Sequence, residues 1–244
     1  MPAPDYQFLL QRSFAPVAGA ASPHVTLTFA QSLDGKIAGA HGKQLILSGA
    51  ESMKATHILR VKHDAIMVGI GTVLNDDPRL TVRLTSDDLP SELDPNDHPQ
   101  PVILDSKLRF PSTAKLTLPA SPKKPWIFTG PDHDPIRKQE LEALGAKVLP
   151  LELDSNGNLS LKHLLAKLHE FSIRSLMVEG GASVITSFLK SGLVDSFVLT
   201  VAPVYVGKDG IGAVNDAVGT PKFVDISYHT LGRDVMMVAK PHRV

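Results

Sequence analysis

Apolar and polar residues alternate with a period of two in several short segments, which is the pattern of a strand that buries one face. The first segment runs from Val25 to Phe29, with threonines between its apolar residues, and Asp34-Gly35 then predicts a turn. The continuous apolar run from Ala65 to Gly69 has the length of a strand and predicts a parallel strand buried on both faces. Alternation of the same kind predicts further strands over residues 102–104, 126–129, 147–149, 176–178 and 197–201.

Segments with helical spacing separate several of these strands. Ser48-Gly49-Ala50-Glu51 has the spacing of a capping box, with Ser48 as the N-cap, and predicts a helix over 49–62. A helix over 135–144 should end at Gly145, a residue typical of helix ends. Ser160 should cap a helix with an apolar stripe over 161–168, and a last helix over 182–191 should end at Gly192.

The end of the chain has a different organisation. Residues 222–229 and 234–239 are expected to be two strands, and the turn at Leu231-Gly232-Arg233 is so short that they must pair antiparallel. The pattern as a whole predicts an α/β fold, with a mostly parallel central sheet, an antiparallel C-terminal hairpin and helices on both faces. We expect one domain over 22–244, preceded by a loosely ordered arm over 1–21.

The acidic, proline-containing segment 85–101 is expected to be an exposed loop inside the domain. The alternative is a linker between two domains. The alternation of strands and helices continues on both sides of this segment, which favours the loop.

Composition narrows the possible functions. The 244 residues include 25 basic and 25 acidic side chains, so the net charge of zero does not favour nucleic-acid binding. No apolar run approaches the roughly 20 residues that span a membrane, and we expect a cytoplasmic protein. The chain has no cysteine, which excludes thiolate chemistry and the cysteine-based zinc site of nucleobase deaminases. The ten histidines lack the i, i+4 spacing of helical metal sites, so we expect no metal.

Two segments, Val68–Pro78 and Met177–Ser183, each lead from an apolar strand through glycines into polar residues. A glycine lets the main chain approach a ligand, and a helix that starts behind it offers unpaired N–H groups to an anion. We therefore expect a phosphate-bearing ligand at the carboxyl ends of these strands. Leu74 stands where a dinucleotide fingerprint would have its third glycine, so a simple strand-to-helix turn remains the alternative for the first segment.

Charged side chains near these segments are candidates for chemistry. Glu179 directly follows an apolar strand, where a carboxylate needs either a function or a nearby cation, unless it is only a solvated loop acid. Arg60 and Arg83 could hold a substrate phosphate or be ordinary surface arginines. The polar cluster from Ser32 to Lys36 is either part of the site or only a hairpin turn.

Four segments together resemble the reductases of riboflavin biosynthesis, in particular the stand-alone fungal and archaeal type. They are Ser32–Lys36, Gly71–Arg83, Leu104–Ser106 and Val178–Gly181, and in order and spacing the resemblance extends from His24 to Lys240. Members of this family reduce 2,5-diamino-6-ribosylamino-4(3H)-pyrimidinone 5′-phosphate with NADPH. The resemblance implies a dihydrofolate-reductase-like fold, a homodimer and NADPH as the cofactor.

The resemblance also implies roles for individual residues. Lys36, Asp76 and Glu179 would transfer protons or stabilise charge. The residues implied to contact the substrate are Ser32, Lys36, Arg60, Leu80, Arg83 and Glu179. Those implied to contact the cofactor are Gly71, Thr72, Asp76, Ser106, Gly180, Gly181, Ala182, Ser183, Val184 and Ile185. Leu45 stands where bacterial members often have a tryptophan that stacks on the cofactor.

Three alternatives to this function stay open at the level of the sequence. The substrate could be the deaminated pyrimidinedione. The enzyme could instead reduce a pterin or folate, in which case Arg60 and Arg83 would have no phosphate to bind. A protein that binds NADP without catalysis, as a sensor, is the third alternative.

Overall fold

The computed structural model describes residues 5–214 and 218–242. The first four residues of the predicted arm, residues 215–217 and the last two residues of the predicted domain lie outside this range. The helices among the described residues are α1 Gln7–Leu10, α2 Ala50–Val61, α3 Ile70–Asp76, α4 Pro135–Ala143, α5 Leu161–Glu170 and α6 Ala182–Ser191, with short 3-10 turns at Ala40–Gly42 and Ser86–Asp88.

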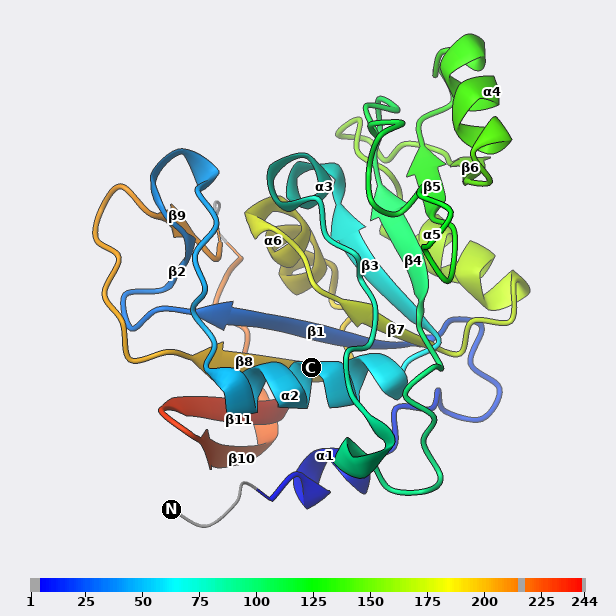
Figure 1. The fold of residues 1–244 in the computed structure, drawn as a ribbon. Helices are drawn as coiled ribbons and strands as arrows, with labels where there is room; N and C mark the ends of the chain where they lie inside the picture. The colour runs from blue at the N-terminus through cyan, green and yellow to red at the C-terminus, as the bar shows by residue number, and fades with distance from the viewer. Residues whose placement is uncertain (1–4, 215–217, 243–244) are drawn as a thin grey trace.

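The strands fall into one large and one small sheet. The large sheet is built from β1 His24–Gln31, β3 Ala65–Gly69, β4 Gln100–Leu104, β5 Trp126–Thr129, β6 Lys147–Pro150, β7 Ser175–Val178, β8 Ser196–Val201, β10 Phe223–Leu231 and β11 Asp234–Pro241. Its order over the described residues is β10-β11-β8-β1-β7-β3-β4-β5-β6 (Figure 1). The small sheet pairs β2, Lys36–Ala38, with β9, Ile211–Gly212.

The pairing within the large sheet confirms the sequence prediction. β1 pairs parallel with both β7 and β8, and β3 pairs parallel with both β7 and β4. β11 pairs antiparallel with β8 and with β10, because the turn at Gly232 reverses the chain directly. The sheet is therefore mostly parallel and has an antiparallel hairpin at its C-terminal end.

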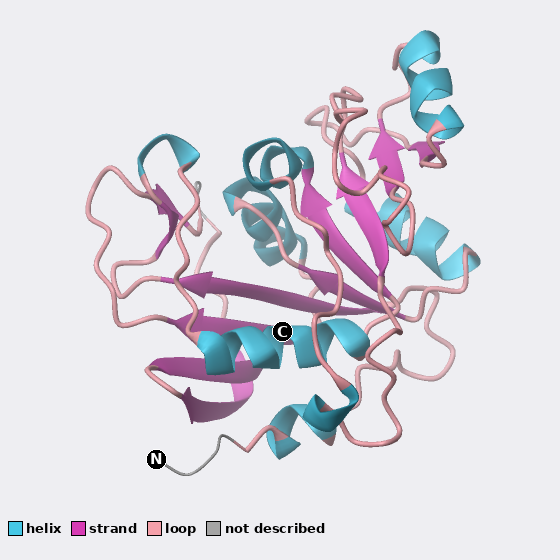
Figure 2. Cartoon of the chain, viewed as in Figure 1, coloured by secondary structure: helices cyan, strands magenta, loops and turns pink. Residues whose placement is uncertain are grey.

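Helices cover both faces of this sheet, also as predicted (Figure 2). On one face, α5 and α6 bury leucines and Phe188 against Leu27, Met67 and Leu176 of the central strands. On the other face, α2 packs against Met177 and Val198. On that same face α3 and α4 cover the half of the sheet that contains Ile103 and Ile127. Each parallel strand thus has apolar side chains on both sides, which explains its continuous apolar sequence.

The prediction of a loosely ordered N-terminal arm is wrong for residues 6–14. Leu9 and Phe14 are buried, and they pack in one apolar cluster with Ile58 and Leu59 of α2. Lys62 adds hydrogen bonds from its Nζ to the main-chain oxygens of Leu9, at 3.0 Å, and Leu10. The arm therefore covers the outer side of α2.

One helix start also differs from the prediction. α2 has Gly49 as its N-cap and no cap from the Ser48 side chain. The Gly49 amide donates to Oδ2 of Asp234 at 2.7 Å, and this carboxylate comes from β11, far along the chain. α6 has the predicted bounds, with Gly181 as its N-cap. The expected exposed loop at 85–101 is confirmed as far as Pro99, with β4 starting at Gln100.

Among the described residues, no helix has both the length and the apolar character needed to cross a membrane.

Candidate functional site

The carboxyl ends of β1, β7 and β3 meet at the point where the order of the sheet departs from the order of the chain. β7 is inserted between β1 and β3, although it follows both in sequence. Open α/β sheets bind ligands at such a switch point, outside the carboxyl ends of the strands. Both glycine segments, which follow β3 and β7, lie at this edge (Figure 1).

Glycines let α6 approach the ends of these strands closely. A Cβ added to Gly180 would lie 2.6 Å from Cβ of Val184, and one added to Gly69 would lie 2.8 Å from Cγ2 of the same valine. Neither position has room for a side chain. A Cβ at Gly181 would lie 3.4 Å from Oγ1 of Thr72, so the two glycine turns lie side by side.

A first cavity of about 670 Å³ opens between these turns and the β2–β9 sheet. Its volume is within the usual range of ligand pockets, about 300–1,000 Å³. Ten of the residues that the sequence assigned to the site line it together: Arg60, Gly71, Thr72, Asp76, Glu179, Gly180, Gly181, Ala182, Ser183 and Val184.

A second cavity of about 800 Å³ adjoins the first one. The two cavities share the lining residues Gly69, Gly71, Ser183 and Val184. Ser106, another predicted cofactor contact, lines the second cavity just beyond β4. The glycine turns therefore stand at the middle of a long cleft with a chamber on each side.

The shape and donors of this cleft fit a dinucleotide. Gly181 gives α6 no side-chain cap, and the first residues of the helix line both chambers. The first-turn N–H groups of a helix attract anions, aided by the helix dipole. A pyrophosphate at the shared glycines would let the two halves of a dinucleotide extend into the two cavities. Ile185, also predicted to contact the cofactor, is instead buried in the apolar core.

Glu179 and Arg60 form a two-point ion pair at the end of β7. The Nε of Arg60 lies 2.8 Å from Oε1 of Glu179, and its Nη2 lies 2.7 Å from Oε2. The Nη1 of Arg60 donates to the main-chain oxygen of Thr81 at 2.9 Å. Burial lowers the pKa of Arg60, but the charge and hydrogen bonds of Glu179 more than offset it, so the pKa is raised. Glu179 therefore has a cation beside it, as expected for a carboxylate that directly follows an apolar strand. The alternative that Glu179 is only a solvated loop acid is excluded.

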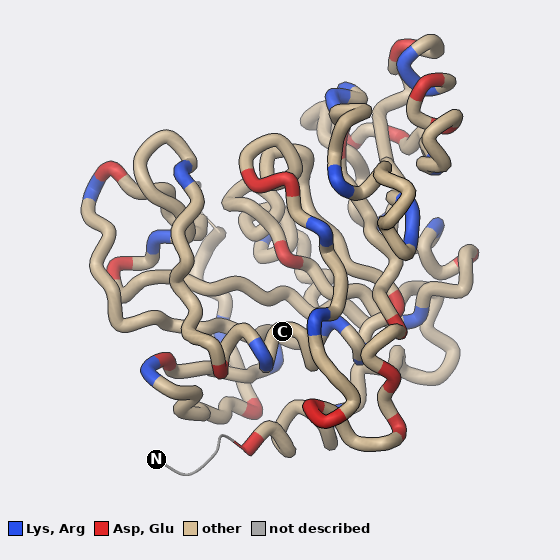
Figure 3. The backbone as a smooth tube through the Cα atoms, viewed as in Figure 1, with Lys and Arg blue, Asp and Glu red and all other residues tan. Residues whose placement is uncertain are grey.

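Asp76 is the other carboxyl group in the first cavity, in the last turn of α3, where Figure 3 marks the acidic residues in red. It is half-buried and forms no ion pair within the described residues. Burial raises the pKa of Asp76. Of the two carboxyl groups in this cavity, Asp76 is therefore the one suited to carry a proton.

Ser32 and Lys36 lie outside both cavities. The Oγ of Ser32 donates to Asp34 at 2.6 Å and accepts from the Lys36 amide at 2.9 Å. Asp34 also accepts from the amides of Val206 and Gly207 at 3.1 and 2.8 Å. The hydrogen bonds from Ser32 and these amides lower the pKa of Asp34 to about 2. The cluster forms the turn that ties β1 to the 203–207 loop. Lys36 itself is on β2, beside the cavity-lining Ile37 and Ala38.

Leu80 and Arg83 also lie outside the lining of the two cavities. The Leu80 side chain is only 3% exposed and packs in the apolar cluster beneath α3. Arg83 is exposed, and its amide donates to Nδ1 of His57 at 3.2 Å. Burial and then the charges of Arg60 and Arg83 lower the pKa of His57 to about 4. The neutral imidazole can accept this bond and so fixes the loop after Leu80.

The sequence did not identify one wall of the first cavity. This wall is formed by Ile37, Ala38, His41, Gly42, Gln44, Leu45, Ile46, Leu47 and Ser48. Most of them lie in an irregular segment without a periodic pattern, so their only signal was the resemblance at Leu45, which does line the cavity. Met53 and Thr56 on α2, and residues at the ends of β1 and β8, also line this cavity and were not identified, although the elements that carry them were predicted.

Comparison with known proteins supports the family that the sequence resembles. The model of the RibD C-terminal domain family matches residues 23–237. The 2,5-diamino-6-ribosylamino-4(3H)-pyrimidinone 5′-phosphate reductase of Debaryomyces hansenii is 41% identical over 201 residues, which are 78% of each chain. The protein of the same name from Methanothermobacter thermautotrophicus is 36% identical and is matched over 96% of its length, with 88% of this chain. The chain spans 58% of the RibD protein of Aquifex aeolicus.

Solved structures confirm the fold. The Saccharomyces cerevisiae riboflavin biosynthesis reductase Rib7 superposes with a TM-score of 0.77 at 29% identity, covering 97% of this chain and 98% of that one. A dihydrofolate reductase from Enterococcus faecalis superposes with a TM-score of 0.51 at 11% identity, covering 90% of this chain and 97% of that one, a likeness of fold alone. The dihydrofolate-reductase-like fold implied by the sequence is therefore confirmed, and the chain belongs to the RibD C-terminal domain family.

Proposed function

We propose that this protein uses NADPH to reduce 2,5-diamino-6-ribosylamino-4(3H)-pyrimidinone 5′-phosphate to the corresponding ribitylamino compound. The observation that carries the proposal is the long cleft centred on two glycine turns, with a half-buried carboxyl group, Asp76, in one chamber only. The names of the relatives suggest the substrate, and the geometry of the cleft supports the positions that we propose for the cofactor and the proton donor. The reaction requires neither a metal ion nor a nucleic acid, and we propose a cytoplasmic location.

The first turn of α6 and the glycines before it would hold the cofactor, together with Thr72 and Ser106. When bound, NADPH supplies a hydride. The chain's own residues must then exclude water from the reacting carbon and provide a proton. The wall from Ile37 to Leu47 bounds the first cavity on one side, and its apolar residues, among them Leu45 and Leu47, would help to exclude water.

The substrate carries an exocyclic amine on C1′ of its ribose. Breaking the C1′–O4′ bond opens the sugar, leaves an iminium at C1′ and requires a proton on O4′. We assign this proton to Asp76, because its raised pKa keeps the carboxyl group protonated to a higher pH than usual. Addition of a hydride to C1′ then gives the ribitylamine, so one proton and one hydride account for the whole change.

Glu179 is paired with Arg60, and it would stabilise the positive charge of the iminium rather than donate a proton. Lys36 stays a predicted proton-transfer residue, placed next to the cavity on β2. Arg60 has donors committed to Glu179 and Thr81, which leaves the exposed Arg83 as the better of the two candidates for the substrate phosphate.

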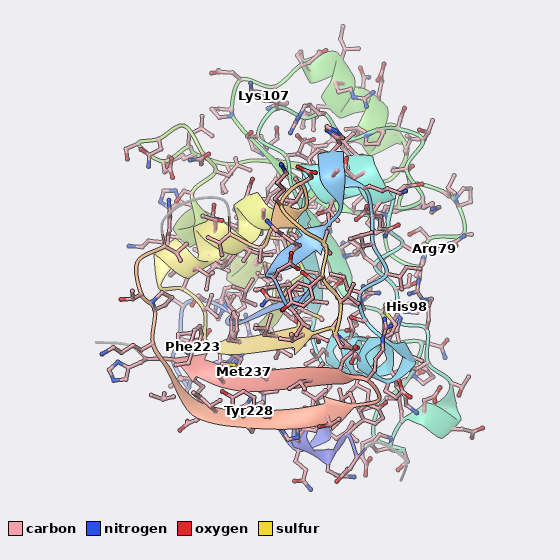
Figure 4. The ribbon with its side chains drawn as sticks, turned by 90° about the vertical axis from the view of Figure 1, so that its left-hand side faces the viewer. Arg79, His98, Lys107, Phe223, Tyr228 and Met237 are labelled. Carbon is pink, nitrogen blue, oxygen red and sulfur yellow. The ribbon has the colours of Figure 1, made fainter. Side chains whose placement is uncertain are left out.

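We also propose that the protein is a homodimer. Leu199, Phe223, Tyr228, Val235 and Met237, here called the open sheet face, lie on β8, β11 and β10 at one end of the large sheet (Figure 4). Tyr228 is 67% and Val235 41% exposed, although both face the same side as the partly buried Met237 and Leu199. An apolar patch with a charged rim, here the Lys240–Asp225 pair, suits a two-fold contact between identical surfaces.

The function is tested by following the loss of NADPH absorbance with each candidate substrate. We expect turnover with the ribosylaminopyrimidine phosphate. Faster turnover of the deaminated pyrimidinedione or of dihydrofolate would favour those alternatives. Firm NADPH binding without turnover of any of the three would indicate a sensor and contradict the proposal.

A further inference from the structure

Three basic side chains line the second cavity, and each comes from a different part of the fold. Arg109 lies in the loop after β4, Lys162 in the first turn of α5, and Lys190 in the last turn of α6. Among the described lining residues there is one carboxylate, Asp154. Its Oδ1 accepts from the amides of Asn156 and Asn158, both at 2.9 Å, so it stabilises its own turn. The second cavity is thus a basic chamber.

Arg109 has donors available for a ligand. Its guanidinium is 56% exposed, and its nearest acid is Oδ1 of Asp105 at 3.8 Å, too far for a hydrogen bond. The other oxygen of Asp105 accepts from the Phe110 amide at 2.7 Å. Burial raises the pKa of Asp105. Arg60 in the first cavity is the contrast, because three of its nitrogens already donate to protein oxygens.

The distribution of charge orients a dinucleotide in the cleft. The carboxyl groups of Asp76 and Glu179 are in the first cavity and are absent from the lining of the second within the described residues. With the pyrophosphate at the shared glycines, the reacting nicotinamide belongs with these carboxyl groups. The adenosine half then extends into the basic chamber. NADPH and NADH differ only in this half, where a 2′-phosphate replaces a hydroxyl group.

We propose that Arg109 and Lys162, with Lys190 beside them, bind the 2′-phosphate and make the enzyme select NADPH over NADH. This inference rests on the proposed function, because it requires a nicotinamide dinucleotide in the cleft. A planar guanidinium binds phosphate through two parallel hydrogen bonds, and each added ammonium strengthens the attraction. Enzymes that use NADH commonly place a carboxylate on the ribose 2′-hydroxyl, and here the one candidate, Asp154, is engaged in its own turn.

The experiment measures the dissociation constants of NADPH and NADH by titration calorimetry for the full chain and for Arg109→Met, Lys162→Met and the double variant. Hydrogen bonds to charged groups predict that each single change weakens NADPH binding about tenfold and both together about a hundredfold. NADH, which lacks the phosphate, should lose less than about threefold in affinity. The matched control is Lys107→Met, because Lys107 is exposed two residues from Arg109 but lines neither cavity (Figure 4).

The same titrations with 2′,5′-ADP and 5′-AMP isolate the adenosine half. The chain should prefer 2′,5′-ADP, and Arg109→Met should remove most of this preference. If both dinucleotides bind and their ratio is the same in the variants as in the unmodified chain, the assignment of the 2′-phosphate is overturned while the proposed function stands. An equal loss for both dinucleotides overturns it too, since the basic side chains would then act on a group that both share. If neither dinucleotide binds the unmodified chain, the proposed function fails and this inference with it.

Discussion

At the scale of single residues, the site separates two carboxyl groups that looked alike in the sequence. Glu179 directly follows β7, Asp76 follows β3 and its glycines, and both were predicted to transfer protons. Glu179 is held by Arg60 at two points, whereas Asp76 forms no ion pair within the described chain and its pKa is raised by burial. Environment rather than residue type therefore divides the roles, with Asp76 as the acid and Glu179 as the fixed negative charge.

Asp76→Asn should lower kcat by about 100-fold or more, the usual contribution of a general acid. Because the protonated carboxyl is the active form, kcat of the unmodified enzyme should fall as the pH rises through the raised pKa of Asp76. Steady-state kinetics across the pH range would measure both effects. In the matched control, Asp77→Asn, the residue lies outside both cavities and contacts Lys115, so the pH profile should be unchanged. A profile that is the same in Asp76→Asn as in the unmodified enzyme would refute the assignment.

Glu179→Gln should destabilise the protein as well as slow it. The change leaves the charge of Arg60, whose side chain is only 11% exposed, without its partner, and breaking such a pair costs about 3 kcal/mol or more. Urea denaturation would measure the free energy of unfolding. The double variant Arg60→Met/Glu179→Gln should recover part of the loss, since no buried charge then remains. If the single and double variants were equally unstable, the pair would not be coupled in this way.

At the scale of helices and strands, local sequence patterns predicted those elements whose structure depends on nearby residues. Periodicity placed the parallel strands, the C-terminal hairpin and the main helices, because an amphipathic period follows directly from the side that each element buries. The start of α2 was misassigned at Ser48: Gly49 is the N-cap, and its amide is held by Asp234, a residue of the last hairpin. No local pattern can reveal a cap that arrives from another element.

The N-terminal arm is the second element that the sequence misjudged. Its apolar residues are too few to form a core alone, and their partners, such as Ile58 and Leu59, belong to α2. Leu9→Ala should therefore lower the free energy of unfolding by about 2–5 kcal/mol, as for other buried leucines. Val17→Ala, at a position 84% exposed in the same arm, should change it little and serves as the control. If Leu9→Ala and Val17→Ala both changed the free energy of unfolding only slightly in thermal or urea unfolding, the arm would not pack on α2.

At the scale of the whole molecule, the two glycine turns were predictable, but the second chamber was not. Arg109 is far in sequence from Asp154 and Lys162, the three residues have no motif in common, and the packing of α5 and α6 against the sheet brings them together. The irregular wall over 39–48 escaped prediction for the same reason. Motifs thus located the middle of the cleft, and tertiary packing defined its ends.

The proposed dimer is also a property of the whole molecule. Tyr228→Asp places a charge in the open sheet face, and burying an unpaired carboxylate in an apolar contact is unfavourable. Light scattering during gel filtration should show a dimer for the unmodified chain and a monomer for this variant. Tyr205→Asp, at a tyrosine 77% exposed outside the open sheet face, should remain dimeric. A monomeric unmodified chain, or a dimer in both variants, would contradict the proposed interface.

The central claim is that one cleft brings a nicotinamide cofactor and a proton donor to the same sugar carbon. The most direct measurement is single-turnover reduction of the ribosylaminopyrimidine phosphate by NADPH that carries deuterium at its transferable position. The account predicts one deuterium on C1′ of the ribitylamino product, and a rate that Asp76→Asn lowers by about 100-fold or more. A product without deuterium at C1′, or oxidation of NADPH that does not depend on the substrate, would contradict it.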